Sequence, residues 1–114
     1  MEAWVRIPGF SEYAISTRGT VVRVKNWRPL KLDWSGRERM KYRAVKLYRA
    51  PVKRKFVLHK LIWVSFYGSV PEGFHIDHID RDRFNNSLCN LRLVSVKENM
   101  ANRGGKFEKR EEAA

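Results

Sequence analysis

Residues 75–103 read HIDHIDRDRFNNSLCNLRLVSVKENMANR, and this segment decides the fold of the second half of the chain. It places the pair Asp77-His78, a polar turn, a short apolar strand and a helix start in that order. Asn90 follows His78 by 12 positions, and Asn99 follows Asn90 by nine. This order predicts that a strand, a loop, a second strand and a helix converge on one point.

The loop of this segment is predicted between residues 79 and 90, which are rich in Asp and Asn. Both residue types favour turns because their side chains bond to the nearby backbone. Asp80 and Asp82 are interpreted as turn residues of this kind. Asn85 and Asn86 are interpreted as structural hydrogen bonders of the loop.

The returning strand is predicted at residues 91–94, where apolar and polar side chains alternate. Ser95 and Glu98 then match a capping box, the pattern in which an N-cap side chain and the third helical residue bond to each other's backbone. A helix is therefore expected to start after Ser95 and to carry Asn99 in its first turn.

The side chains that converge suit the hydrolysis of a phosphodiester bond, which needs a base for the attacking water and a cation. A histidine exchanges its proton near neutral pH, so His78 suits the role of base. Asp77 and Asn99 offer the oxygen ligands that Mg²⁺ or Mn²⁺ prefers, with one ion per site. Asn90 is the nearest candidate to hold the second ring nitrogen of His78.

Three neighbouring residues allow more than one interpretation. His75 lies two positions before Asp77 and is an auxiliary ligand or, as we favour, a structural or substrate-side residue. Arg92 either pairs with an acid or contacts phosphate. A zinc site built from His75, His78 and Cys89 lacks the paired cysteines of structural zinc sites.

The charge of the chain indicates a polyanionic partner. The net charge is +12, and residues 1–60 hold 16 Lys or Arg against four acids, whereas residues 61–114 hold eight of each. Such a field attracts phosphate, so DNA, expected to be double-stranded, is the predicted partner. A membrane surface is less favoured because no basic amphipathic helix is evident. The predicted DNA-binding residues are Arg23, Lys25, Arg28, Lys53, Arg54, Lys55, Arg81 and Arg83.

Length and cysteine content bound the class of protein. The 114 residues suffice for one compact unit, predicted to be a monomer. Cys89 is the only cysteine, which favours a reducing, intracellular compartment. No run of about 20 apolar residues and no signal peptide is present, so no membrane partner is expected.

The first half of the chain predicts one small antiparallel sheet. Residues 4–24 read as a hairpin, and residues 27–32 and 43–48 read as further strands around a polar stretch near Gly36. Apolar residues at helical spacing predict a buried helix in residues 57–68 that ends near Gly68. His59, on this helix, is expected to be a packing residue. Trp27 and Trp34, earlier in the chain, are expected to pack in the core.

Four short motifs in the second half resemble those of the HNH endonuclease family, in particular its phage and intron homing branch with a ββα-metal core. The resemblance implies His78 as general base, Asn90 as the residue that positions the histidine and its loop, and Asp77 with Asn99 as metal ligands. It also implies the cytoplasm of a bacterial host if the chain is phage-encoded. The motifs are Asp77-His78-Ile79-Asp80, Asn85-Asn86, Asn90-Leu91-Arg92 and Glu98-Asn99.

A second resemblance covers the N-terminal part, so that together the two span residues 4–103. The helix residues Leu58-His59-Lys60-Leu61 and Phe66 are similar to the segment that precedes the core in that family. Two features depart from the family pattern: Arg81 stands where a glycine usually turns the chain, and only a short tail from Gly104 follows where homing members commonly continue into a reader of DNA sequence. The residues that resemble a modular DNA-binding motif often joined to such nucleases are Trp4, Ile7-Pro8-Gly9-Phe10, Tyr13, Ile15-Ser16 and Gly19.

These observations predict an α+β protein in which a small N-terminal antiparallel sheet and a helix pack with a C-terminal ββα-metal core. Residues 1–52 are expected to form the basic DNA-binding motif, residues 53–103 the helix and catalytic core, and residues 104–114 a flexible tail. The predicted function is a metal-dependent DNA endonuclease that nicks its substrate. The alternative is a nucleic-acid-binding module that keeps the same scaffold without catalysis.

Overall fold

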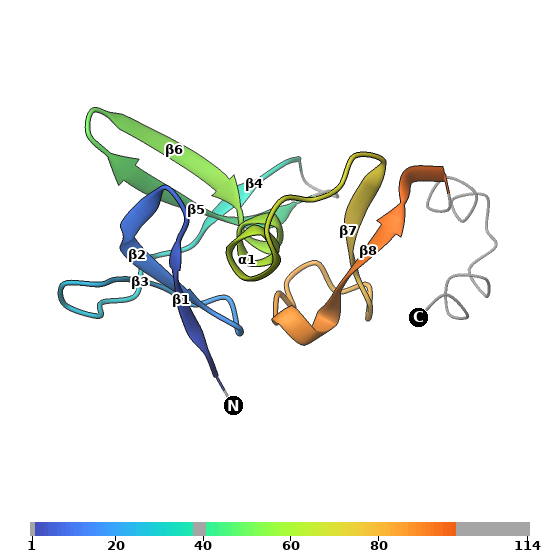
Figure 1. The fold of residues 1–114 in the computed structure, drawn as a ribbon, viewed down its shortest axis with the longest axis horizontal. Helices are drawn as coiled ribbons and strands as arrows, with labels where there is room; N and C mark the ends of the chain where they lie inside the picture. The colour runs from blue at the N-terminus through green and yellow to red at the C-terminus, as the bar shows by residue number, and fades with distance from the viewer. Residues whose placement is uncertain (1, 38–40, 98–114) are drawn as a thin grey trace.

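The computed structural model describes residues 2–37 and 41–97. Over these ranges, three antiparallel sheets surround one α-helix (Figure 1). The mixed α+β class is therefore confirmed. The prediction of a single N-terminal sheet is wrong, because the first half forms two separate three-stranded sheets.

The first sheet consists of β1 (Trp4–Ile7), β2 (Phe10–Ser16) and β3 (Val21–Arg23) in the order β1-β2-β3. The predicted hairpin is thus present and gains a third strand. The turn between β2 and β3 is closed by the buried Ser16. Its Oγ accepts hydrogen bonds from the backbone N–H groups of Arg18 (3.1 Å) and Thr20 (3.2 Å). Gly19 in this turn has a φ of 89°, which glycine adopts without steric cost.

The second sheet consists of β4 (Asp33–Ser35), β5 (Tyr42–Arg49) and β6 (Val52–Val57) in the order β4-β5-β6. The strand predicted at 27–32 is wrong: Trp27 has a positive φ of 57°, and Pro29 makes only an isolated bridge to Val22. A left-handed residue and a proline without an N–H interrupt strand pairing. The strand begins instead at Asp33, inside the polar stretch near Gly36 expected to separate two strands.

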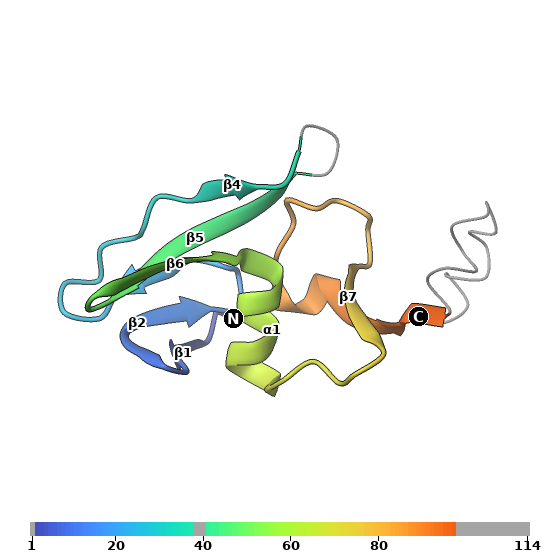
Figure 2. The same cartoon turned by 90° about the horizontal axis from the view of Figure 1, so that it is seen from above.

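The helix α1 (Leu58–Tyr67) follows β6 directly and ends at Gly68, as predicted. Its residues Leu58, Leu61 and Ile62 are buried and contact both N-terminal sheets (Figure 2). The core that forms around them is one contiguous cluster, which contains Ile7, Tyr13, Ile15, Val21, Val45, Leu47, Leu58, Leu61, Ile62 and Leu91.

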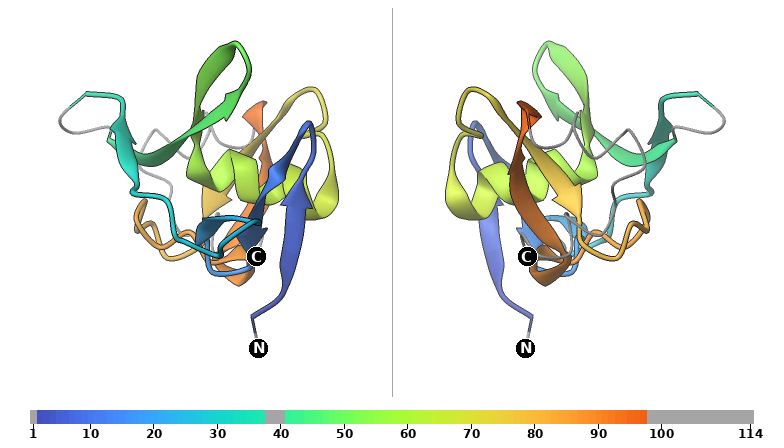
Figure 3. Two further views of the ribbon diagram at one scale, coloured as in Figure 1. Left: turned by 90° about the vertical axis from the view of Figure 1, so that its left-hand side faces the viewer. Right: turned by 90° about the vertical axis from the view of Figure 1, so that its right-hand side faces the viewer.

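The third sheet is the hairpin of β7 (Phe74–His78) and β8 (Leu91–Ser95), which lies on the other side of α1 from the first two sheets (Figures 1 and 2). Figure 3 shows the β5–β6 hairpin projecting past the helix. Val96 and Lys97 after β8 are helical, as the capping box predicts. Glu98 and Asn99 lie outside the described residues, as does the predicted tail.

Candidate active site

His78 is the last residue of β7, where it pairs with Leu91 of β8 and is 6% exposed. The strand ends there because the chain turns: the N–H of Arg81 donates to the carbonyl oxygen of His78 at 2.9 Å. Neighbouring residues of a strand point to opposite faces, so Asp77 and His78 require this ending to face one cavity. Both residues line a cavity of about 670 Å³, together with His59 and His75.

Asn90 holds the loop between β7 and β8 rather than the ring of His78. Its Nδ2 donates to Asp80 Oδ1 and to the carbonyl oxygen of Asn85, both at 2.9 Å, and its Oδ1 accepts from the N–H of Asp80 at 3.2 Å. The prediction that Asn90 holds the loop is therefore confirmed, whereas direct bonding to the ring is wrong. Asn90 is occupied because the loop folds back over its side chain.

The ring of His78 is bonded instead by Asn86, whose Oδ1 lies 2.8 Å from Nε2. Asn86 is 5% exposed, so this contact is shielded from water. The sequence showed two adjacent asparagines without distinguishing them. Only the course of the loop decides that Asn85 bonds to Asp80 while Asn86 turns inward to the histidine.

The loop itself is stabilised by short-range bonds from carboxylates. Asp80 Oδ1 accepts from the N–H of Asp82 at 2.8 Å, and Asp82 Oδ1 accepts from the N–H of Phe84 at 3.0 Å, so both are turn residues as predicted. The hydrogen bond from Asn85, followed by those from the Asp82 backbone and Asn90, holds the pKa of Asp80 below its usual value. Asp80 is thus kept ionised by its role in the loop.

Arg81 adopts a φ of 65° in this loop. Residues with a Cβ rarely take this left-handed conformation, and glycine takes it freely. The residue that departs from the family pattern therefore keeps the glycine-like backbone at that position.

His59 of α1 packs edge-on against His78, with ring centroids 4.9 Å apart, and its other neighbour is Tyr42 at 5.1 Å. The predicted packing role of His59 is thus confirmed, but its partner is the site histidine. Burial, then the charges of His78 and Lys60, lower the pKa of His59 to about 4. His59 is therefore neutral at physiological pH.

Asp77 is paired with Arg92, the first of the two roles considered for the arginine. The Nε of Arg92 donates to Asp77 Oδ2 at 3.2 Å, and a terminal nitrogen lies at the same distance. Across residues 2–37 and 41–97, no group of three or more His, Cys, Asp or Glu side chains is placed to hold a metal ion. The carboxylate of Asp77 nevertheless fits Mg²⁺, which commonly takes one or two carboxylates and keeps several waters.

The predicted DNA-binding residues fall into three separate groups. Arg81 and Arg83 line the cavity of His78. Residues 53–55 are exposed on β6. Arg23 ends β3, and residues 24–28 lie on the connection from β3 towards β4, at the end of the molecule away from β7 and β8 (Figures 1 and 2). The structure therefore brings only the first group to the site.

Two tryptophans expected in the core are exposed instead. Trp27 is 55% exposed and meets the ring of Trp4 edge-on. Trp34 is 42% exposed, with the guanidinium of Arg43 at 4.1 Å over its ring and Phe84 of the loop edge-on at 5.3 Å. The two tryptophans thus pack against other side chains at the surface.

No helix in the described part of the chain is long and apolar enough to cross a membrane.

Known proteins are similar to this chain in both sequence and fold. Residues 56–101 match the model of an HNH endonuclease family. The DNA endonuclease I-HmuI of Bacillus phage SP01 is 30% identical over 102 residues, which are 87% of this chain and 56% of that protein. Protein 3.8 of Escherichia phage T7 is 42% identical over 55 residues, which are 48% of this chain and 41% of that protein.

The structural comparison agrees with the sequence comparison. A solved structure described as DNA binding and cleavage by the HNH homing endonuclease I-HmuI matches with a TM-score of 0.77 and 28% identity, over 91% of this chain and 59% of that one. The chain spans about half the length of these curated relatives. The HNH endonuclease model thus matches the part of the chain that carries the site motif, and the fold is similar to that of the HNH homing endonuclease I-HmuI.

Proposed function

We propose that the chain is a metal-dependent DNA endonuclease that hydrolyses a phosphodiester bond and nicks double-stranded DNA as a monomer. The observation that carries this proposal is the buried His78 beside Asp77, at the end of β7 and on the wall of a cavity. Lys60, Arg81 and Arg83 line the same cavity. Cations around a cleft concentrate phosphate there, so a base and a carboxylate face the place where a phosphodiester would bind.

In this proposal His78 takes the proton from the attacking water. Asp77 and Asn99 would hold Mg²⁺ or Mn²⁺, one ion per site; the bound ion would neutralise negative charge on the phosphate. Nucleases of this family generally depend on a divalent metal ion. Asn90 holds the loop after β7, so its role is to keep the site in shape rather than to touch the reacting atoms.

DNA would be held by exposed cations of the strand-rich half, above all residues 53–55 of β6, with Arg23, Lys25 and Arg28 further along the duplex. His75, exposed on β7, would contact the substrate. We retain the division into a DNA-binding part, residues 1–52, and a catalytic part, residues 53–103; the hairpin β5–β6 joins the two. A reducing, intracellular compartment remains our proposal.

The test is a nicking assay on supercoiled plasmid with Mg²⁺. Wild type should convert the plasmid to open circles, and so should the control variant Cys89→Ser, which changes an exposed residue. EDTA should stop this cleavage in both proteins. His78→Ala should lose cleavage and still bind DNA in a gel-shift assay. Cleavage by His78→Ala at the wild-type rate would refute the proposal.

A non-catalytic binding module is the second candidate, and one observation favours it: the carboxylate of Asp77 is already paired with Arg92. Such a protein would bind DNA equally well with or without EDTA and would not nick DNA with any metal ion. Salt would weaken DNA binding in both cases because phosphate contacts release counterions. The metal-dependent nick therefore decides between the two.

A further inference from the structure

Asn86 is a buried polar residue outside the predicted catalytic set, and its bond to His78 restricts the chemistry of the histidine. The amide oxygen Oδ1 of Asn86 lies 2.8 Å from Nε2 of His78, and both residues are buried. An amide oxygen can only accept a hydrogen bond. The neutral histidine must therefore carry its hydrogen on Nε2 and its lone pair on Nδ1.

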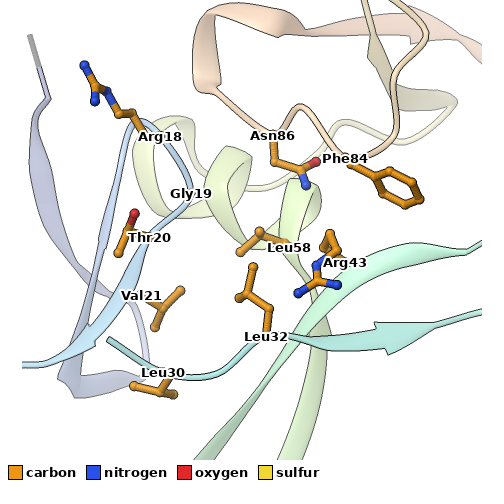
Figure 4. Close-up of a pocket in the computed structure, with 10 residues that line it drawn as sticks. All are labelled: Arg18, Gly19, Thr20, Val21, Leu30, Leu32, Arg43, Leu58, Phe84 and Asn86. Carbon is orange, nitrogen blue, oxygen red and sulfur yellow. The ribbon is translucent and has the colours of Figure 1, made fainter. Parts of the chain in front are cut away.

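Asn86 is itself held from two sides. Figure 4 shows it beside Phe84 on the loop after β7, with Gly19 and Leu58 facing it. These residues line a cavity of about 230 Å³. The carbonyl oxygen of Asn86 lies 3.5 Å from the position that a Cβ on Gly19 would take. Two residues further along, the N–H of Leu88 donates to the carbonyl oxygen of Thr17 at 2.7 Å. The β2–β3 turn of the first sheet thus supports this stretch of the loop.

The other support comes from Asn90, whose Nδ2 donates to the carbonyl oxygen of Asn85, immediately before Asn86. Asn90 therefore affects the histidine indirectly, because it holds the backbone that carries Asn86. The hydrogen bond to His78 is made by a side chain whose own backbone has few alternative positions.

We propose that Asn86 is the positioning residue of His78: it holds the hydrogen on Nε2, so that Nδ1 is the nitrogen that takes the proton from water. This inference rests on the proposed nuclease function. Partners that fix the tautomer and orientation of a site histidine typically contribute 10–100-fold, so about that loss of rate is expected without Asn86. Because Asn86 is buried behind the histidine, DNA binding should not change.

Two variants of similar shape separate the hydrogen bond from mere packing. Asn86→Leu removes the acceptor, and Asn86→Asp retains it. Single-turnover cleavage at saturating protein should fall about 10–100-fold in Asn86→Leu, with the DNA concentration for half-saturation unchanged. Asn86→Asp, which keeps the acceptor, should recover most of the rate. Cys89→Ser, an exposed change on the same loop, is the matched control and should cleave as wild type.

The tautomer can be measured directly in the unmodified, metal-free protein by long-range ¹H–¹⁵N correlation of the ring nitrogens. Wild type should show the neutral His78 with Nε2 protonated, and Asn86→Leu should show a mixture. A hydrogen on Nδ1 in wild type overturns the proposal even if Asn86→Leu does not fold. Cleavage by Asn86→Leu at the wild-type rate also overturns the proposal. An equal loss of rate in Asn86→Leu and Asn86→Asp does so too. Absence of metal-dependent cleavage by wild type would instead refute the nuclease function and leave the tautomer measurement standing.

Discussion

Acid should destabilise the protein through His59 at a pH well above the range in which carboxylates protonate. Burial against Tyr42 and His78 lowers the pKa of His59 from 6.5 to about 4, and its Nδ1 is buried without a hydrogen-bond partner in the described residues. Between these two values the unfolded chain binds a proton that the folded chain excludes, so stability falls as the pH falls. At about 1.4 kcal/mol per pKa unit, the full effect is about 3 kcal/mol. Native domains have only about 5–15 kcal/mol in total, so the loss is large.

The assay is urea unfolding, followed by tryptophan fluorescence at several pH values from 7 to 4. His59→Phe keeps a ring between Tyr42 and His78 but cannot take up a proton. Its free energy of unfolding should therefore fall by about 3 kcal/mol less than that of wild type over this range. His75→Gln is the control, because it removes an exposed histidine that lines the same cavity. It should follow the wild-type curve.

Two carboxylates set a separate, more acidic range. The backbone N–H of Trp34 lowers the pKa of Asp33, and the hydrogen bond from Asn85 lowers that of Asp80. A lowered carboxyl pKa stabilises the fold above about pH 4 and loses that contribution only below it. Identical pH dependence of wild type and His59→Phe between pH 6.5 and 4 would show that the burial of His59 does not carry the effect.

Two further changes test the loop after β7. Asn90→Ala removes three hydrogen bonds, two of them to Asp80, and should lower the free energy of unfolding by about 2–3 kcal/mol in urea, at about 1 kcal/mol per bond; a change under 0.5 kcal/mol would mean that the loop is held elsewhere. Arg81→Gly relieves a left-handed backbone and should raise stability by roughly 1 kcal/mol while weakening DNA binding in a salt titration. A less stable Arg81→Gly protein would show that the arginine side chain outweighs its backbone strain.

The sequence predicted the elements whose signals are local. The helix α1 has apolar residues at helical spacing and a glycine at its end, and the pair β7–β8 has its loop marked by Asp and Asn. Tertiary pairing decided the rest. Residues 27–32 have strand-like composition, yet the positive φ of Trp27 and the proline at 29 displace the strand to Asp33–Ser35, where three residues pair with β5.

The site was predicted in its residue types but not in its hydrogen bonds. Spacing brought His78, Asp77 and Asn90 to one place, as the structure has them. It could not choose between Asn86 and Asn90 as the partner of the ring, because both follow His78 in the same turn-rich loop. That choice depends on which amide the folded loop turns inward, and contacts from the first sheet, 67 or more residues earlier than Asn86, take part in it.

Those contacts make the two halves of the chain interdependent. The loop that carries Asn86 is held by Asn90 within the hairpin and by the β2–β3 turn, through Thr17 and the space left by Gly19. A side chain at Gly19 would meet Ile62 of α1 at 3.1 Å and face the loop backbone at 3.5 Å. The first sheet therefore contacts the loop that carries the hydrogen-bond partner of His78. Because that loop carries Asn86, the geometry of the site depends on residues in both halves of the chain.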